Sequence, residues 1–215
     1  MHTARYRILS VAACGLIALG AAACGSDEDD SSQDFAAADL EGLNFAADEF
    51  PEMDYQPDGS GLGAFVRDQK REAKEEGDRS GLEFAASLQE LGLEEDYVSQ
   101  FFAFERGAEL SFVESIGFLF EDAERAEAAV DVVREGVARN IRPAEEIDVP
   151  EFGEQAFGFS GEFEGFPTYS VGWRVGDVIQ LATVAPGDPD AGPQGTIELA
   201  EQLADSQADE SGGAG

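Results

Sequence analysis

Imidazole and thiol groups are scarce in this chain, which has one histidine and two cysteines among its 215 residues. All three lie near the N-terminus, as His2, Cys14 and Cys24. A Ser–His or Cys–His nucleophile relay needs an imidazole or a thiolate, and zinc sites are built mainly from the same groups. The rest of the sequence argues against both kinds of centre. We therefore expect no enzyme activity, no metal site and no cofactor.

Positive charge is also scarce, with 13 lysines and arginines against 46 aspartates and glutamates and a formal net charge of −33. A field of this sign repels DNA and RNA, so we expect no nucleic-acid partner. The acidity is compatible with adaptation to a saline habitat and with calcium binding. Asp188 and Asp190 offer oxygen ligands, but the acidic residues lack the spacing of an EF-hand loop.

The first 23 residues have the order of an export signal peptide. Arg5 and Arg7 precede an uncharged run from Ile8 to Ala23, and small residues lead into Cys24. The run is shorter than the roughly 20 residues that cross a bilayer as a helix. The cysteine at the cleavage point resembles the bacterial lipoprotein signal, which implies a diacylated Cys24 and a palmitate-bearing anchor. An uncleaved anchor and an ordinary secretory signal are the alternatives.

Composition divides the remaining chain into three parts. Residues 24–61 begin with a run of like charges and contain turn residues, which predicts an acidic, largely disordered tether. Phe35 and Leu40 interrupt this tether, so its second half is a candidate for docking on the domain. Residues 62–205 predict one compact domain, and the polar residues 206–215 predict a disordered tail.

Hydrophobic periodicity within the domain alternates between that of helices and that of strands. Helices are expected at 62–74, 80–91, 122–139 and 196–204. Strands are expected at 97–104, 109–120, 157–163, 169–175 and 178–184. Ser80 and Glu83 predict a capping box, and Gly176-Asp177 predicts a tight hairpin. The fold class is therefore α+β, with a single antiparallel sheet of about five strands and helices packed on it.

One group of cations lies in the first of these helices. Leu62, Phe65 and Val66 predict its apolar face, and the opposite face carries the only basic cluster that the sequence has after the signal. This cluster consists of Arg67, Lys70, Arg71 and Lys74.

Two segments of the domain resemble known sequences. The first is Leu88–Ala129, which contains Gly92–Tyr97 (GLEEDY) and Phe118–Ala123 (FLFEDA). The second combines Gly153–Phe159 (GEQAFGF) with Trp173–Ile179 (WRVGDVI). Together they resemble poorly characterised envelope lipoproteins of actinobacteria, and the layout is similar to the Mog1/PsbP-like α/β/α sandwich. The resemblance implies an envelope protein and supplies no catalytic residues.

Aromatic residues provide the candidate ligand-facing positions. Phe157, Phe159, Phe163, Tyr169 and Trp173 alternate with small or polar residues along two expected strands. They form either the buried face of the sheet or the lining of a pocket for an apolar ligand.

These observations predict an exported protein that is lipid-anchored at the outer face of the cell membrane. The first interpretation is a non-enzymatic binding or sensing module that meets an unknown envelope protein. The second is a carrier of an apolar ligand or lipid in a cavity between sheet and helices. The third is an enzyme that uses carboxylates alone, for which Glu162 and Glu164 are the best pair.

Overall fold

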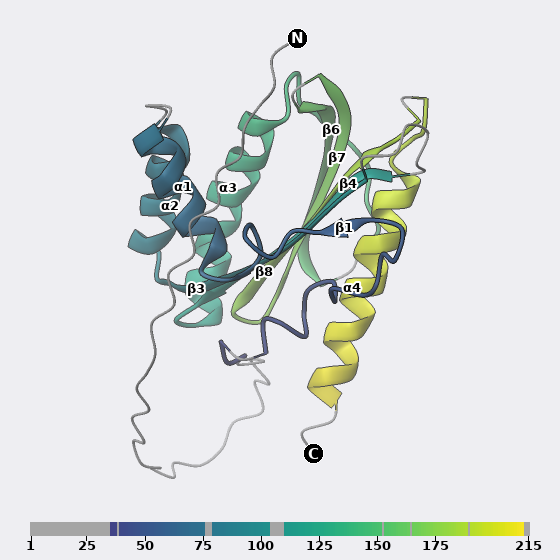
Figure 1. Ribbon diagram of the computed structural model, residues 1–215. Helices are drawn as coiled ribbons and strands as arrows, with labels where there is room; N and C mark the ends of the chain where they lie inside the picture. Colours follow the sequence, from purple (N-terminus) through teal and green to yellow (C-terminus); the bar gives the residue numbers. More distant parts are fainter. Residues whose placement is uncertain are drawn as a thin grey trace, which may run out of the picture. The chain divides into compact units, whose positions relative to one another are not determined.

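The computed structural model describes residues 35–37, 39–75, 79–103, 110–151, 153–163, 165–188 and 190–212. These residues form an α+β fold with one antiparallel sheet and four helices (Figure 1). The five long strands are β3 (Leu93–Phe102), β4 (Leu110–Phe120), β6 (Glu154–Phe163), β7 (Phe166–Val175) and β8 (Val178–Pro186).

Three two-residue strands raise the sheet from the expected five strands to eight in the described residues. They are β1 (Asp54–Tyr55), β2 (Gly61–Leu62) and β5 (Glu145–Glu146). The first two pair with β3 and the third pairs with β6, so all three lie at the edges of the order β1-β3-β4-β8-β7-β6-β5. A two-residue strand shows no alternation in the sequence, because its existence depends on a partner strand distant in the chain.

The described helices are α1 (Ala64–Glu75), α2 (Ser80–Glu90), α3 (Ala123–Asn140) and α4 (Gln194–Gly212). None of these helices is long and apolar enough to cross a membrane. The fourth continues past 204 into the segment expected to be a disordered tail, because each further residue adds a backbone hydrogen bond to an existing helix.

The sheet is covered on both faces (Figure 1). Helices α1, α2 and α3 lie on one face, and α4 lies on the other. On the three-helix face, strand residues Ile116, Phe118 and Ile179 pack against α3 residues such as Val133. On the α4 face, Trp173 and its neighbours pack against α4. This division follows from the strand geometry, which points successive side chains to opposite faces.

The N-terminal part of the described chain belongs to this domain. Leu40 and Leu43 are fully buried, and Phe45 is 2% exposed. The Phe45 ring meets the Phe50 ring edge-on at 5.1 Å, and Phe50 in turn meets Phe101 of β3 at 4.9 Å. Each buried side chain of this kind contributes about 1.5–3 kcal/mol, which offsets the entropy of ordering the segment. The domain therefore begins by residue 35, whereas the sequence predicted a tether up to residue 61.

The turn between β7 and β8 is the tight hairpin that Gly176-Asp177 predicts. Val175 pairs with Val178, and Gly176 has φ +57°, a conformation that glycine adopts without a Cβ clash. The Asp177 carboxylate accepts hydrogen bonds from the Phe35 backbone N–H, at 3.1 Å and 3.2 Å to its two oxygens. The hairpin therefore also holds the start of the described domain.

The start of α2 differs from the sequence prediction. Ser80 is the first helical residue, and the N-cap is Arg79, whose side chain makes no capping hydrogen bond. The expected capping box does not form, because Ser80 lies one position too far into the helix to serve as its cap.

Candidate functional site

The beginning of α1 is fixed by an acid from β3. The chain turns into α1 at Gly63, which has φ +67° and donates its N–H to the Asp96 carbonyl at 2.6 Å. The Asp96 carboxylate accepts from the backbone N–H groups of Phe65 (2.7 Å) and Val66 (3.4 Å). Burial raises the pKa of Asp96, and these two N–H groups act in the opposite direction. Asp96 thus serves as an N-cap supplied from a neighbouring strand.

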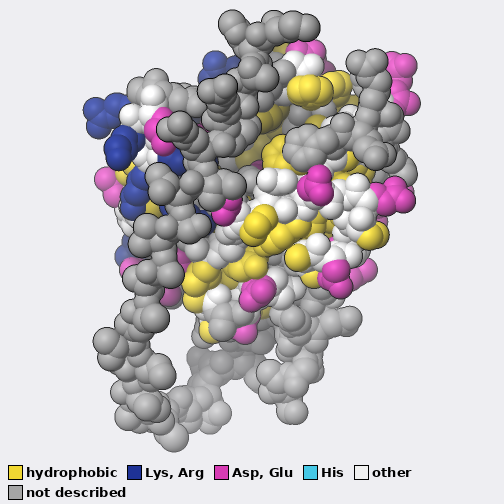
Figure 2. Space-filling model, in the orientation of Figure 1, with side chains coloured by type: hydrophobic (Ala, Val, Ile, Leu, Met, Phe, Trp, Pro, Cys, Tyr) yellow, Lys and Arg dark blue, Asp and Glu magenta, His cyan; other side chains and the backbone are white. Residues whose placement is uncertain are grey.

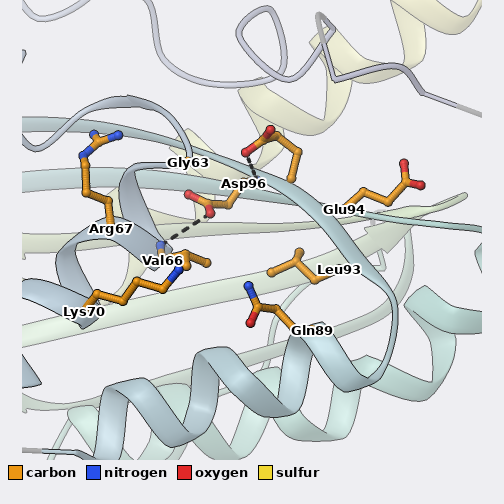
Figure 3. A pocket seen from close by; sticks show the side chains of 9 residues that line it. Gly63, Val66, Arg67, Lys70, Gln89, Leu93, Glu94 and Asp96 are labelled. Atoms are coloured by element: carbon orange, nitrogen blue, oxygen red, sulfur yellow. Dashed lines mark hydrogen bonds between the residues drawn. The ribbon is translucent and has the colours of Figure 1, made fainter. Parts of the chain in front are cut away.

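A groove of about 390 Å³ lies between α1, the end of α2 and the first residues of β3 (Figure 3). Val66 and Leu93 give it apolar surface, and Lys70 and Gln89 bring polar groups to it. Figure 3 shows Lys70 extending toward Gln89 across the groove, whereas Glu94 points away. Leu62, just before α1, leaves 48% of its surface exposed.

The outer face of α1 carries the basic cluster that the sequence analysis identified. Arg67, Lys70, Arg71 and Lys74 are all exposed, and their spacing of i, i+3, i+4 and i+7 places them along one side of the helix. Figure 2 shows Lys and Arg side chains gathered on the side of the molecule where Figure 1 places α1 and α2. We call these four residues the cation stripe.

The two arginines and the two lysines of the cation stripe differ in their hydrogen-bond and ion-pair partners. Arg67 donates to the carbonyls of Leu62 (3.3 Å) and Ser60 (3.5 Å), and Arg71 pairs with Asp68 at 3.1 Å. Lys70 and Lys74 form no ion pair with any residue that the structure describes. Two ammonium groups of the cation stripe therefore face solvent uncompensated by described side chains.

A row of polar side chains crosses four strands on the face that α1 covers. Gln100, Glu114, Thr183 and Ser170 are successive partners on β3, β4, β8 and β7. The Gln100 side-chain amide donates to Glu114 Oε2 at 2.6 Å, and the hydroxyls of Ser170 and Thr183 lie 2.6 Å apart. Glu114 thus occupies a position where the neighbouring members of its strand, Phe112 and Ile116, are apolar.

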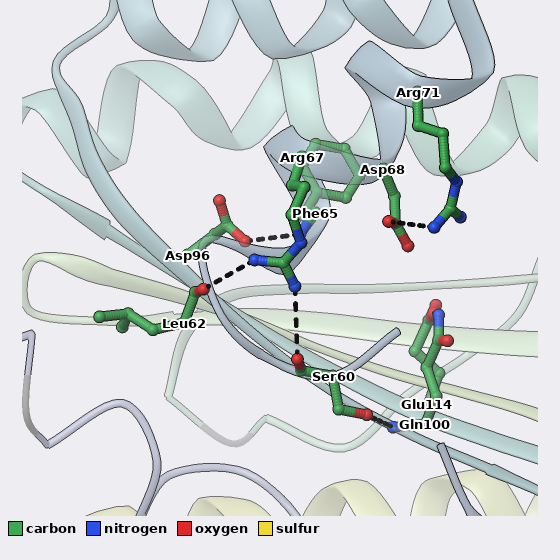
Figure 4. A network of polar contacts seen from close by, with 9 residues as sticks. All are labelled: Ser60, Leu62, Phe65, Arg67, Asp68, Arg71, Asp96, Gln100 and Glu114. Atoms are coloured by element: carbon green, nitrogen blue, oxygen red, sulfur yellow. Dashed lines mark hydrogen bonds and ion pairs between the residues drawn. The ribbon is translucent and has the colours of Figure 1, made fainter. Parts of the chain in front are cut away.

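Glu114 is the acid of this region with the strongest perturbation. Burial raises its pKa to about 7; the Gln100 hydrogen bond lowers it, and the negative charges of Asp68 and Glu72 on α1 raise it further. Burial also raises the pKa of Asp68, against the opposing charges of Arg71 and Arg67. Figure 4 shows Asp68 and Glu114 on opposite sides of the space between α1 and the sheet. This side of α1 is therefore acidic, whereas its outer side is basic.

In the part of the chain that the structure describes, no group of three or more histidine, cysteine or acidic side chains has metal-binding geometry. The calcium candidates Asp188 and Asp190 are joined by a local contact, in which the Asp190 N–H donates to Asp188 Oδ1 at 3.0 Å. Of the carboxylate pair weighed for hydrolysis, Glu162 lies exposed in β6 and Glu164 is outside the described residues. Cys24 is also outside them.

The structure divides the candidate aromatics between the two faces of the sheet. Phe157 and Phe159 are buried on the three-helix face, whereas Trp173 is fully buried on the α4 face. Tyr169 is half-buried and donates its hydroxyl to the Ala191 carbonyl at 2.7 Å, and Phe163 is 46% exposed. The five side chains therefore do not line one common surface.

A second pocket of about 240 Å³ lies beside the outer edge of β6. Phe157 is the one member of the aromatic set that borders it, together with Arg134 and Glu146, which form an ion pair at 2.5 Å. The pocket is lined mainly by polar groups and short loop segments, unlike an apolar ligand cavity.

The inward-facing position of Glu114 could have been recognised from the sequence, although it was not among the candidate site residues. A charged residue at an inward position of a strongly alternating strand indicates either a bulge or a buried polar contact. The role of Asp96 had no comparable signal, because the residues it caps lie about thirty positions earlier.

Comparisons with known proteins give a likeness of fold and no match of sequence. No family model matches the chain, and no curated protein sequence matches it. Among solved structures, the chain is similar to the extracellular domain of PknH from Mycobacterium tuberculosis. The two share 12% sequence identity and a TM-score of 0.49, over 85% of this chain and 99% of that one.

Proposed function

We propose that this chain is an exported lipoprotein that acts at the outer face of the cell membrane as a non-enzymatic binding module. Its binding surface is the groove between α1 and β3 together with the cation stripe. The observation that carries this proposal is the exposure of two lysines, Lys70 and Lys74, that form no ion pair with a described residue, on a protein of net charge −33. On an acidic protein, a cluster of positive charges favours encounter with a negatively charged partner.

The anchor part of the proposal is supported by the sequence around Cys24. The test is the intact mass of the protein extracted from the membranes of the producing cells. We expect a chain that begins at Cys24 and carries a diacylglyceryl group. Cys24→Ser should abolish the modification, and Cys14→Ser is the matched control that should keep it. A mature product cleaved elsewhere and lacking fatty chains would contradict the anchor.

The binding part is tested by photo-crosslinking in the producing cells. A photoreactive amino acid replaces Gln89, which borders the groove, and in a matched strain it replaces Glu201 on the exposed side of α4. We expect a discrete crosslinked product from position 89 alone. Equal products from both positions, or none from position 89, would contradict a binding surface at the groove.

The carrier of an apolar ligand is the alternative, and it has less support. The aromatic side chains that would line its cavity are divided between two faces, and three of the five are buried in the two cores. The core is also closely packed at this place: a Cβ on Gly172 would lie 2.4 Å from Phe157 Cζ and 2.6 Å from Leu181 Cδ2.

A further inference from the structure

We propose that the partner of the cation stripe is a short acidic polypeptide segment that also carries apolar side chains. This inference rests on the proposed function, because it names the chemistry of the partner at the same surface. Three features point to it: the placement of the four cations, the surface beside them and the charge of the rest of the chain.

Repulsion within the cation stripe works against α1, although Arg71 pairs with Asp68 and Lys74 lies in the last turn, where the helix dipole favours a cation. The members of the cation stripe lie three and four residues apart, and like charges at those spacings disfavour a helix. Only Arg71 is paired with a described carboxylate within the helix. A solvated helix face of an acidic protein would be more stable with acids and cations alternating. The arrangement therefore has a cost that an external anion would relieve.

The size of the cation stripe limits the partner. From Arg67 to Lys74 the helix rises about 10 Å, close to the screening length of about 8 Å at physiological ionic strength. A long polyanion or an anionic membrane would bring most of its charge against the rest of an acidic protein, which has 46 aspartates and glutamates against 13 lysines and arginines. An extended peptide advances about 3.3 Å per residue, so about four residues match the stripe.

The surface beside the cation stripe favours a polypeptide over a polyphosphate. Val66 and Leu93 line the groove next to Lys70, and Leu62 is 48% exposed nearby. A polyphosphate has no apolar group to place there. Three acids, Glu94, Glu95 and Asp96, line the side of the groove formed by β3, so the acidic groups of a partner belong on the α1 side. A peptide that combines acidic and apolar residues satisfies both the cations and this apolar surface.

The test uses the full chain held in neutral phosphatidylcholine nanodiscs. The probe is a fluorescein-labelled peptide of repeated Glu-Glu-Leu units, and binding is followed by fluorescence anisotropy at several salt concentrations. The comparison probe is a peptide of repeated Lys-Lys-Leu units. Inorganic polyphosphate and phosphatidylglycerol vesicles serve as competitors.

The decisive variant is the double substitution Lys70→Glu/Lys74→Glu. Its matched control is Arg125→Glu/Arg139→Glu, which makes the same charge change at exposed positions of α3. We expect the Glu-Glu-Leu peptide to lose about tenfold or more in affinity with the first variant and about threefold or less with the second. Binding should weaken with salt, and the Lys-Lys-Leu peptide should not bind. Unchanged circular dichroism of both variants shows that folding is intact.

Three outcomes would overturn the proposal: no binding of the Glu-Glu-Leu peptide, equal loss with both variants, or displacement of the peptide by vesicles or polyphosphate at lower concentrations than unlabelled peptide. The crosslinking experiment at Gln89 is independent of peptide charge. A crosslink that persists when the peptide fails would therefore remove only the partner chemistry and leave the binding module in place.

Discussion

Glu114 of β4 lies directly opposite Gln100 of β3, and the 2.6 Å hydrogen bond between their side chains joins two strands beneath α1. The contact favours the carboxylate form of Glu114, because an amide donates a stronger hydrogen bond to a charged oxygen than to a neutral one. Burial and the charges of Asp68 and Glu72 nevertheless favour the protonated form. The acid therefore exchanges its proton near neutral pH.

Stability should depend on this proton. The pKa of Glu114 is about 7 in the folded protein against an ordinary value of 4.5, so the folded state binds more protons between these limits. Its contribution is fully present below about pH 4.5 and is lost as the pH rises through 7. We expect Glu114→Gln to be more stable than the wild type at pH 8, by on the order of 2 kcal/mol, and equally stable near pH 4.5.

Urea unfolding of both proteins across this pH range measures the difference. The control is Glu127→Gln, which makes the same substitution at an exposed position of α3. We expect it to leave the free energy of unfolding unchanged at every pH. A difference between Glu114→Gln and wild type that stays constant with pH would show that Glu114 titrates normally.

The cap at α1 should be measurable by removing its acceptor. Asp96→Ala takes away the carboxylate that accepts from Phe65 and Val66, and we expect a loss of about 1–2 kcal/mol in the free energy of unfolding. Asp96→Asn keeps one acceptor oxygen in the same place and should lose less. If both substitutions cost the same in urea unfolding, the hydrogen bonds to α1 do not account for the effect.

The packing at Gly172 discriminates between a filled interior and an apolar cavity. Gly172→Ala would force a methyl group against Phe157 and Leu181, and we expect a destabilisation of about 1–3 kcal/mol by thermal or urea unfolding. Gly195→Ala in the first turn of α4 meets nothing within 4 Å and should be neutral or stabilising. If the Gly172→Ala protein is as stable as the wild type, the interior has room for a methyl group at this place, which would support the carrier interpretation.

The N-terminal boundary of the domain can be tested at Phe45. Its ring is 2% exposed, so Phe45→Ala should cost about 3–5 kcal/mol. Phe166→Ala removes a ring that is 58% exposed and should cost little. A small effect at position 45 in urea unfolding would mean that residues 35–55 contribute little to the domain, as the expected tether would.

The sequence predicted the elements that depend on local pattern. Residues 122–139 show a sustained helical period with an acid at its start, and α3 begins and ends within one residue of that range. The Asp122 side chain caps the helix by accepting from the Arg125 N–H at 2.7 Å. The β7–β8 hairpin was fixed by two turn residues. The basic cluster on α1 was also found, because its spacing shows directly on a helix.

Features set by distant partners were not predictable in the same way. The two-residue strands exist only through pairing with β3 and β6. The bulge between Leu110 and Phe112 places Leu110 on the α4 side, whereas strict alternation along the strand expected at 109–120 would put both residues on the same face. Likewise the aromatic set was treated as one stripe, whereas Phe157 and Trp173 lie on opposite faces. Phe157 is paired with Gly172 across the β6–β7 hairpin, so the next residue, Trp173, points to the other side of the sheet.

The hydrogen bonds from the Phe35 N–H to Asp177 fix the point at which the chain joins the domain. They therefore limit the length of the segment that can connect the domain to a lipid anchor. With the lipid on Cys24 that we propose, the chain has only the residues between these two points with which to leave the bilayer. At 3.3–3.6 Å per residue, even a straight chain allows about 40 Å. Phe35 can then lie no farther than this from Cys24, so the β7–β8 hairpin that holds it stays close to the lipid head groups.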